Sequence, residues 1–113
     1  MSAITTHVLD TSKGRPAAGV PITLLLGDGG EWRELGRGVT DGDGRLRTLM
    51  PAGSAATAGT YLLRFDTAAY FAATGVEAFY PEVRVVFTVP LDGGHYHVPL
   101  LLSPYGYSTY RGS

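Results

Sequence analysis

Cysteine is absent from this chain of 113 residues, and its absence excludes several kinds of site at once. Without thiolates there can be no disulfide bond, zinc–thiolate site, iron–sulfur cluster or cysteine nucleophile. A chain without cysteine suits a reducing compartment, and the amino terminus lacks the basic patch and apolar run of a secretory signal. We therefore expect a cytoplasmic location.

Long hydrophobic runs and an excess of one charge are missing as well. No segment approaches the roughly 20 apolar residues that a membrane span needs. The formal net charge is -1, and the Lys and Arg residues are scattered, so the sequence offers no basic surface for nucleic acid or an anionic membrane. We expect neither of these partners.

The composition is that of a folded protein. Hydrophobic residues make up 44% of the chain and charged residues 17%, a mixture too apolar for a disordered segment. The length lies near the commonest domain size and leaves room for one hydrophobic core. We predict a single domain over residues 1–113.

Turn-forming residues are abundant: 16 glycines and 7 prolines interrupt short runs of β-branched, aromatic and leucine residues. This spacing predicts an all-β fold, either a sandwich or a barrel. A short helix is expected at residues 67–75, with Thr67 as its cap and Gly75 at its end. The predicted strands are residues 4–10, 20–26, 31–39, 45–49, 60–66, 82–89 and 95–103, with 106–111 as an eighth.

So many strands in so short a chain leave sheet edges exposed, which proteins often resolve by pairing subunits. The consecutive residues Leu100, Leu101 and Leu102 point to alternate faces of their strand, which indicates that both faces are covered. We expect a homo-oligomer.

Histidine is the side chain best suited to exchange protons near neutral pH, and the chain has three: His7, His95 and His97. All three fall on predicted strands. His95 and His97 are two positions apart and share a face, so one of them could meet His7 if the first and penultimate strands are neighbours. The alternative for each is a histidine with satisfied hydrogen bonds and no chemical role.

Arg45 opens a predicted strand directly after an Asp-Gly-Asp-Gly turn, where it could donate to a carbonyl oxygen or an anion. The alternative is a solvated charge at a strand end. Residues 105–113 are rich in tyrosine almost to the end, which favours a docked tail rather than a frayed one.

Familiar enzyme motifs are missing: there is no Gly-x-Ser-x-Gly elbow, phosphate-binding loop, dinucleotide fingerprint or helical His-Glu-x-x-His. His95 and His97 could serve as metal ligands, but no carboxylate or cysteine partner is evident. We expect no metal and no other cofactor.

Three motifs make the chain resemble the transthyretin-like 5-hydroxyisourate hydrolases along nearly its whole length. They are TTHVLDT with GRPA (residues 5–11 and 14–17), TDGDGR (residues 40–45), and HYHVPLLLSP running into YSTYRGS (residues 95–104 and 107–113). The resemblance implies a transthyretin-like (prealbumin-like) two-sheet β-sandwich with one short helix. It also implies a homotetramer, a dimer of dimers formed by edge-strand pairing, with active sites between the dimers.

The resemblance further implies a catalytic group of His7, Arg45, His97 and the terminal Ser113, with Tyr110 shaping the pocket and binding substrate together with Arg45 and His7. Water would hydrolyse a cyclic amide of 5-hydroxyisourate during urate breakdown, giving a ureidoimidazoline. Neutral His7 or His97 would take a proton from water while Arg45 stabilises the developing oxyanion. Which histidine is acid and which is base stays open.

Other functions remain possible at this point. The main alternative is a non-catalytic transthyretin-like carrier of a small aromatic ligand. A metal-dependent oxygenase that uses histidines and tyrosines is another. A purely structural sandwich module is the third, although it gives no reason for a docked aromatic tail.

Overall fold

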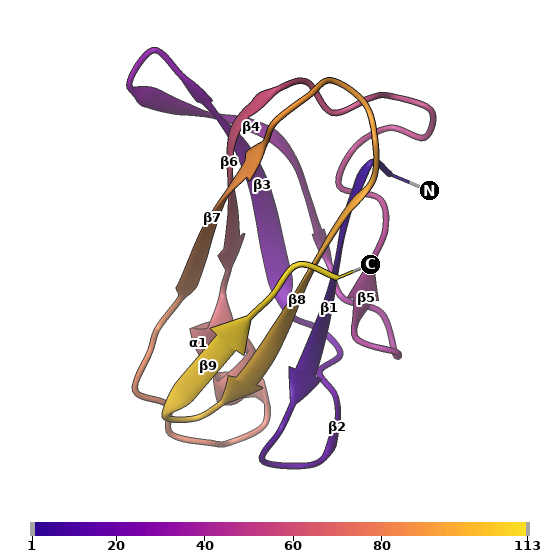
Figure 1. The fold of residues 1–113 in the computed structure, drawn as a ribbon. Coiled ribbons are helices and arrows are strands. Elements are labelled where there is room, and N and C mark those ends of the chain that lie inside the picture. Colours follow the sequence, from indigo (N-terminus) through magenta and orange to yellow (C-terminus); the bar gives the residue numbers. More distant parts are fainter. Residues whose placement is uncertain (1, 113) are drawn as a thin grey trace.

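The computed structural model describes residues 2–112, which form two β-sheets and one short helix (Figure 1). The elements in chain order are β1 (Ile4–Asp10), β2 (Arg15–Pro16), β3 (Pro21–Asp28), β4 (Glu31–Val39), β5 (Arg45–Leu46), β6 (Gly59–Phe65), α1 (Thr67–Ala73), β7 (Val83–Val89), β8 (Tyr96–Ser103) and β9 (Gly106–Thr109). No helix within residues 2–112 has the length and apolar character to cross a membrane.

The two sheets are built from different parts of the chain. One has the order β2-β1-β8-β9, with the short strand β5 also paired to β1, and the other has the order β4-β3-β6-β7. β1 and β8 are parallel, whereas the other pairs are antiparallel. The parallel pair joins the two ends of the sequence in the first sheet (Figure 1).

The core fills the space between the sheets because side chains of each strand alternate between two faces. On β7, Val83 and Val89 are buried and Val85 and Phe87 are half-buried, while Val86 between them is 58% exposed. The buried apolar residues of both sheets form a single cluster. The predicted all-β sandwich with one short helix is confirmed.

A buried carboxylate ties the helix to the first sheet. Asp10 at the end of β1 is fully buried and accepts hydrogen bonds from the Tyr70 hydroxyl at 2.7 Å and the Ser12 hydroxyl at 2.6 Å. Burial raises the pKa of Asp10, but these bonds and the backbone N–H groups of Ser12 and Lys13 outweigh it and lower that pKa. Burial and the Asp10 carboxylate raise the pKa of Tyr70 to about 12.

The helix cap differs from the prediction. Asp66, not Thr67, is the N-cap, and its carboxylate accepts a hydrogen bond from the backbone N–H of Ala69 at 3.1 Å. Thr67 instead donates its hydroxyl to the carbonyl oxygen of Tyr80. Gly75, expected at the helix end, follows it with a φ of 70°.

The predicted strand 45–49 is shorter than expected, because β5 contains only Arg45 and Leu46. Leu46 and Leu49 are both buried in the core. Residues three positions apart would lie on opposite faces of a regular strand, so the chain leaves the extended conformation to bury both. The predicted strand 106–111 also ends early, at Thr109.

Candidate active site

Part of the outer face of the first sheet carries polar side chains. Ile4 and Val8 of β1 point into the core, so the alternating residues Thr5 and His7 point away from the second sheet. Thr5 lies opposite His97 of β8, and His7 lies opposite Arg45 of β5. Residues directly opposite one another on paired strands have neighbouring side chains. Three segments far apart in the sequence therefore meet on one face.

The Thr5 hydroxyl joins two of the histidines. Its oxygen lies 2.8 Å from Nδ1 of His97 and 3.3 Å from Nε2 of His95. Both imidazoles are therefore on the same side of the sheet, as their spacing predicted. His95 itself precedes β8 and is exposed, so its predicted place within a strand is wrong. The adjacency of the first and penultimate strands, on which a meeting with His7 depended, is present as the β1–β8 pair.

The turn before β5 fixes the positions of His7 and Arg45. The Asp41 carboxylate accepts hydrogen bonds from the backbone N–H groups of Asp43 at 2.9 Å and Arg45 at 3.0 Å. The bond from Arg45 is the main reason that the pKa of Asp41 is lowered. Nε2 of His7 lies 2.8 Å from the carbonyl oxygen of Asp43, so the turn contacts the histidine directly.

Gly44 completes this turn. It has a φ of 75°, and a Cβ at this position would overlap the carbonyl oxygen of Val8 on β1. Only glycine allows both the left-handed conformation and this close approach. The turn formed by the Asp-Gly-Asp-Gly motif therefore positions Arg45 next to β1.

Burial is the main cause that lowers the pKa of the half-buried His97. The Arg45 charge lowers that pKa further, with smaller electrostatic contributions from His7, His95 and Arg47, because like charges disfavour the imidazolium. His97 is therefore neutral near pH 7 and keeps one lone pair and one N–H.

Two residues of this face were not singled out from the sequence, Thr5 and Arg47. Arg47 is exposed and its charge is one of those that lower the pKa of His97. It lies two positions after Arg45, a spacing that would place both on one face of the predicted strand 45–49 and could have indicated it. Thr5 gave no such signal, because its role depends on the pairing of β1 with β8.

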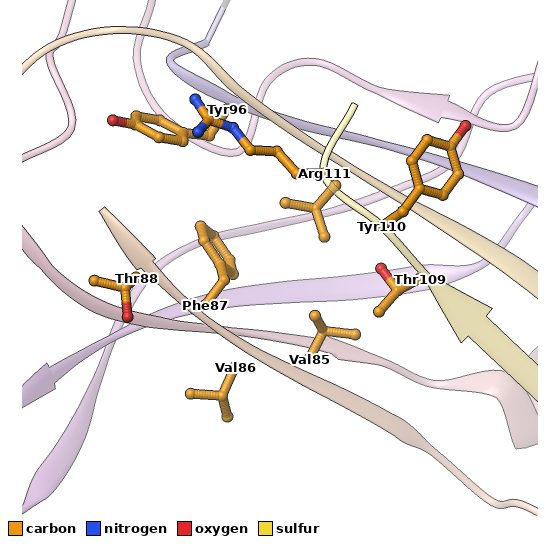
Figure 2. A pocket seen from close by; sticks show the side chains of 9 residues that line it. Val85, Val86, Phe87, Thr88, Tyr96, Thr109, Tyr110 and Arg111 are labelled. Atoms are coloured by element: carbon orange, nitrogen blue, oxygen red, sulfur yellow. The ribbon is translucent and has the colours of Figure 1, made fainter. Parts of the chain in front are cut away.

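The tail docks against His97. The backbone N–H of Gly112 donates to the carbonyl oxygen of His97 at 2.7 Å, and a Cβ on Gly112 would lie 2.7 Å from the His97 ring. The guanidinium of Arg111 stacks 4.8 Å from the centre of the Tyr96 ring. Tyr110 is 56% exposed, and Figure 2 shows it extending away from Arg111. Ser113, which the resemblance places in the catalytic group, lies outside the described residues.

A separate, mainly apolar pocket opens between the sheet edges formed by β7 and β9 (Figure 2). None of its lining residues is a histidine; they are Val85, Val86, Phe87, Thr88, Tyr96, Val98, Thr109, Tyr110 and Arg111. The histidine face and this pocket are therefore different surfaces of the chain. Within residues 2–112, no group of three or more His, Cys, Asp or Glu side chains is arranged to hold a metal ion.

A family model and a sequence relative place the chain among the same proteins. Residues 4–112 match the model of the HIUase/Transthyretin family. The chain is 48% identical over 114 residues to the 5-hydroxyisourate hydrolase of Mus musculus, covering 99% of this chain and 96% of the mouse protein.

Solved structures of two kinds share the fold. The 5-hydroxyisourate hydrolase of Klebsiella pneumoniae superposes with a TM-score of 0.82 at 39% identity, covering 100% of this chain and 94% of that one. Transthyretin from Sparus aurata superposes with a TM-score of 0.90 at 34% identity, covering 99% of this chain and 97% of that one. The fold alone therefore does not separate a hydrolase from a transthyretin, and the side chains of the site must do so.

Proposed function

The chain belongs to the HIUase/Transthyretin family, and from this premise we propose that it hydrolyses 5-hydroxyisourate to 2-oxo-4-hydroxy-4-carboxy-5-ureidoimidazoline. One observation carries the proposal: His7, Arg45 and His97 come from three distant segments and lie on one face. A face with a guanidinium and neutral imidazole can bind a polar heterocycle and move protons on it.

We propose that water is the nucleophile. As its oxygen bonds to the amide carbonyl carbon, one neutral imidazole, His7 or His97, takes its proton. Arg45 stabilises the negative charge that develops on the carbonyl oxygen. The C–N bond then breaks, and the second histidine supplies a proton to the leaving nitrogen. The lowered pKa of His97 supports this scheme, because it keeps that imidazole neutral near pH 7.

Ser113 and Tyr110 complete the proposed site. The backbone bond from Gly112 to His97 supports a role for Ser113, which is the next residue in the chain. Tyr110 is exposed and available for substrate contact. We expect Ser113→Ala to reduce kcat/KM for 5-hydroxyisourate while leaving the circular dichroism spectrum unchanged. Unchanged kcat/KM would remove Ser113 from the catalytic group.

We also propose a homotetramer, a dimer of dimers in which each subunit is one domain, working in the cytoplasm without a cofactor. β9 ends the first sheet and β7 ends the second, beside the open pocket of Figure 2. These edge strands support a dimer in which they pair with the same strands of a second subunit. Half-exposed Leu9 and Leu101 lie opposite each other on the histidine face and support its burial against a second dimer. Sedimentation equilibrium tests this, and a monomeric mass would contradict it.

The rival function is a carrier, and the TM-score of 0.90 with a transthyretin favours it. An ultraviolet assay separates the two. Urate oxidase generates the unstable 5-hydroxyisourate from urate, and the protein is added with and without a chelator. A hydrolase speeds the decay in both conditions, whereas a carrier binds without speeding it and a metal-dependent enzyme stops when chelated.

A further inference from the structure

Thr5 occupies an unusual place for a small hydroxyl residue. It is only 3% exposed, and its hydroxyl touches His97 on one side and His95 on the other. His97 is half-buried and His95 is exposed. The three groups therefore form a hydrogen-bonded row that runs from solvent into the proposed active site.

The number of hydrogens in this row limits its arrangement. A hydroxyl has one hydrogen, and a neutral imidazole has one N–H and one lone pair. Thr5 can therefore donate to only one histidine and must accept from the other. If it donates to Nδ1 of His97, the His97 proton is on Nε2; if it donates to His95, the His97 proton is on Nδ1.

The distances favour the first arrangement. O–H donors make shorter hydrogen bonds than N–H donors do. The 2.8 Å distance to Nδ1 of His97 suits a bond in which the Thr5 hydroxyl donates. The longer 3.3 Å distance to Nε2 of His95 is closer to the length of a bond in which the histidine N–H donates. We propose that Thr5 is a positioning residue that holds His97 with its proton on Nε2 and links it to His95. This inference rests on the proposed hydrolase function.

His7 has the same tautomer, but the opposite ring nitrogen is left free of a partner within the turn. Its Nε2 lies 2.8 Å from the carbonyl oxygen of Asp43, and a carbonyl oxygen only accepts. Nε2 of His7 therefore carries the hydrogen, and the lone pair is on Nδ1. His7 then offers a proton acceptor and His97 a proton donor, which divides the base and acid roles between them.

The row also balances the protons of the reaction. Nδ1 of His7 takes the proton of water as the C–O bond forms, and Nε2 of His97 gives its proton to the nitrogen as the C–N bond breaks. A neutral imidazole can give up that proton only if Nδ1 gains one. Thr5 supplies it and is refilled from Nε2 of His95, which takes a proton from solvent. After the reaction His7 returns its proton to solvent. The row is reset when Nε2 of His97 takes a proton from solvent and its Nδ1 passes one back through Thr5 to Nε2 of His95, which releases a proton to solvent.

Nitrogen-15 NMR of the histidine-labelled protein tests the tautomers without any substrate. We expect the wild type to show protonated Nε2 and unprotonated Nδ1 for both His7 and His97 at neutral pH. Thr5→Val, which keeps the shape and removes the hydroxyl, should give a mixture of His97 tautomers, and Thr5→Ser should restore the wild-type pattern. A wild-type His97 with its proton on Nδ1, or an unchanged pattern in Thr5→Val, would overturn the proposal.

Kinetics test the link to His95. Thr5→Val and His95→Ala should each lower kcat roughly 10- to 100-fold, the size seen when a group that orients a metal-bound histidine is removed, with little change in KM. The double variant should lose no more than the worse single variant, because both changes break one row. Losses that multiply would refute the link.

Thr6→Val is the matched control. Thr6 is the next residue of β1 and equally buried, but its hydroxyl donates to the carbonyl oxygen of Val98 and not to a histidine. Its kcat should stay near that of the wild type. If the wild type itself does not turn over 5-hydroxyisourate, the proposed function fails, while the NMR pattern still decides the tautomers.

Discussion

Arg45→Met removes the positive charge nearest to the proposed chemistry while keeping a long side chain. Arg45 is half-buried, is placed by the Asp41 turn and lies opposite His7. The backbone bond to Asp41 does not depend on the side chain, so the turn should persist. The variant therefore tests the guanidinium and not the fold, and Arg45→Lys is its matched control with the charge retained.

The expected loss follows from how firmly the guanidinium is held. A preorganised donor to a developing oxyanion is worth roughly 100- to 1000-fold in kcat. Because Arg45 is only half-buried, solvent screens part of its charge, and we expect a loss near 100-fold, or about 2.7 kcal/mol. Arg45→Lys should lose less, since it keeps the charge but not the planar pair of donors.

The same variant should change the titration of His97. Burial and then Arg45, His7, His95 and Arg47 lower the pKa of His97. Removal of the Arg45 charge leaves the other causes in place, so the pKa of His97 should rise in Arg45→Met and stay low in Arg45→Lys.

The ultraviolet decay assay gives kcat, and histidine NMR titration gives the pKa of each variant. Circular dichroism serves as the control that checks whether both variants fold. If the kcat of Arg45→Met stays within about twofold of the wild type, the activation free energy has changed by under about 0.5 kcal/mol. That result would refute the role of Arg45. A His97 pKa that does not move would refute the electrostatic coupling between the two side chains.

Three further predictions concern stability. Tyr70→Phe should lower the free energy of unfolding by roughly 1.5–3 kcal/mol in urea, because the buried Asp10 carboxylate loses a donor at 2.7 Å. Gly36→Ala should cost about 1–3 kcal/mol, because a Cβ there would overlap the carbonyl oxygen of Leu49. The stability that neutral His97 contributes is present above pH 6.5, its ordinary pKa, and is lost as the pH falls towards its lowered folded-state pKa. His97→Gln should flatten this acid-side decline in urea titrations.

Each stability prediction has a control or a contrary outcome. Gly42→Ala is the control for Gly36→Ala, because nothing lies within 4 Å of a Cβ at Gly42. Equal stabilities of these two variants would contradict the close approach at Gly36. An unchanged midpoint in Tyr70→Phe would contradict the importance of the bond to Asp10, and an unchanged acid-side slope in His97→Gln would show that other groups cause it.

Local patterns predicted most of the strands. Turn-forming residues separated strands such as residues 31–39 and 82–89 from their neighbours. One error arose where burial overrode the alternation of a strand. The segment from Leu46 to Leu49 leaves its strand to bury both leucines, and the sequence gives little sign of that choice.

Residue type singled out the histidines and Arg45, but their assembly into one site was predicted only through the resemblance. His7 and His97 are 90 residues apart, and their approach depends on the parallel pairing of β1 with β8. Such long-range pairing is not encoded in local propensity, so spacing alone could not bring the two histidines together. The role of Thr5 needs the same register, because a shift by one residue would turn its side chain into the core.

The most direct test of the central claim compares the decay of 5-hydroxyisourate with the wild type and with His97→Gln. The wild type should speed the decay, and His97→Gln should lose roughly 100-fold or more in kcat/KM while remaining folded. Equal rates for the two proteins, or a wild type that leaves the spontaneous decay unchanged, would contradict the account.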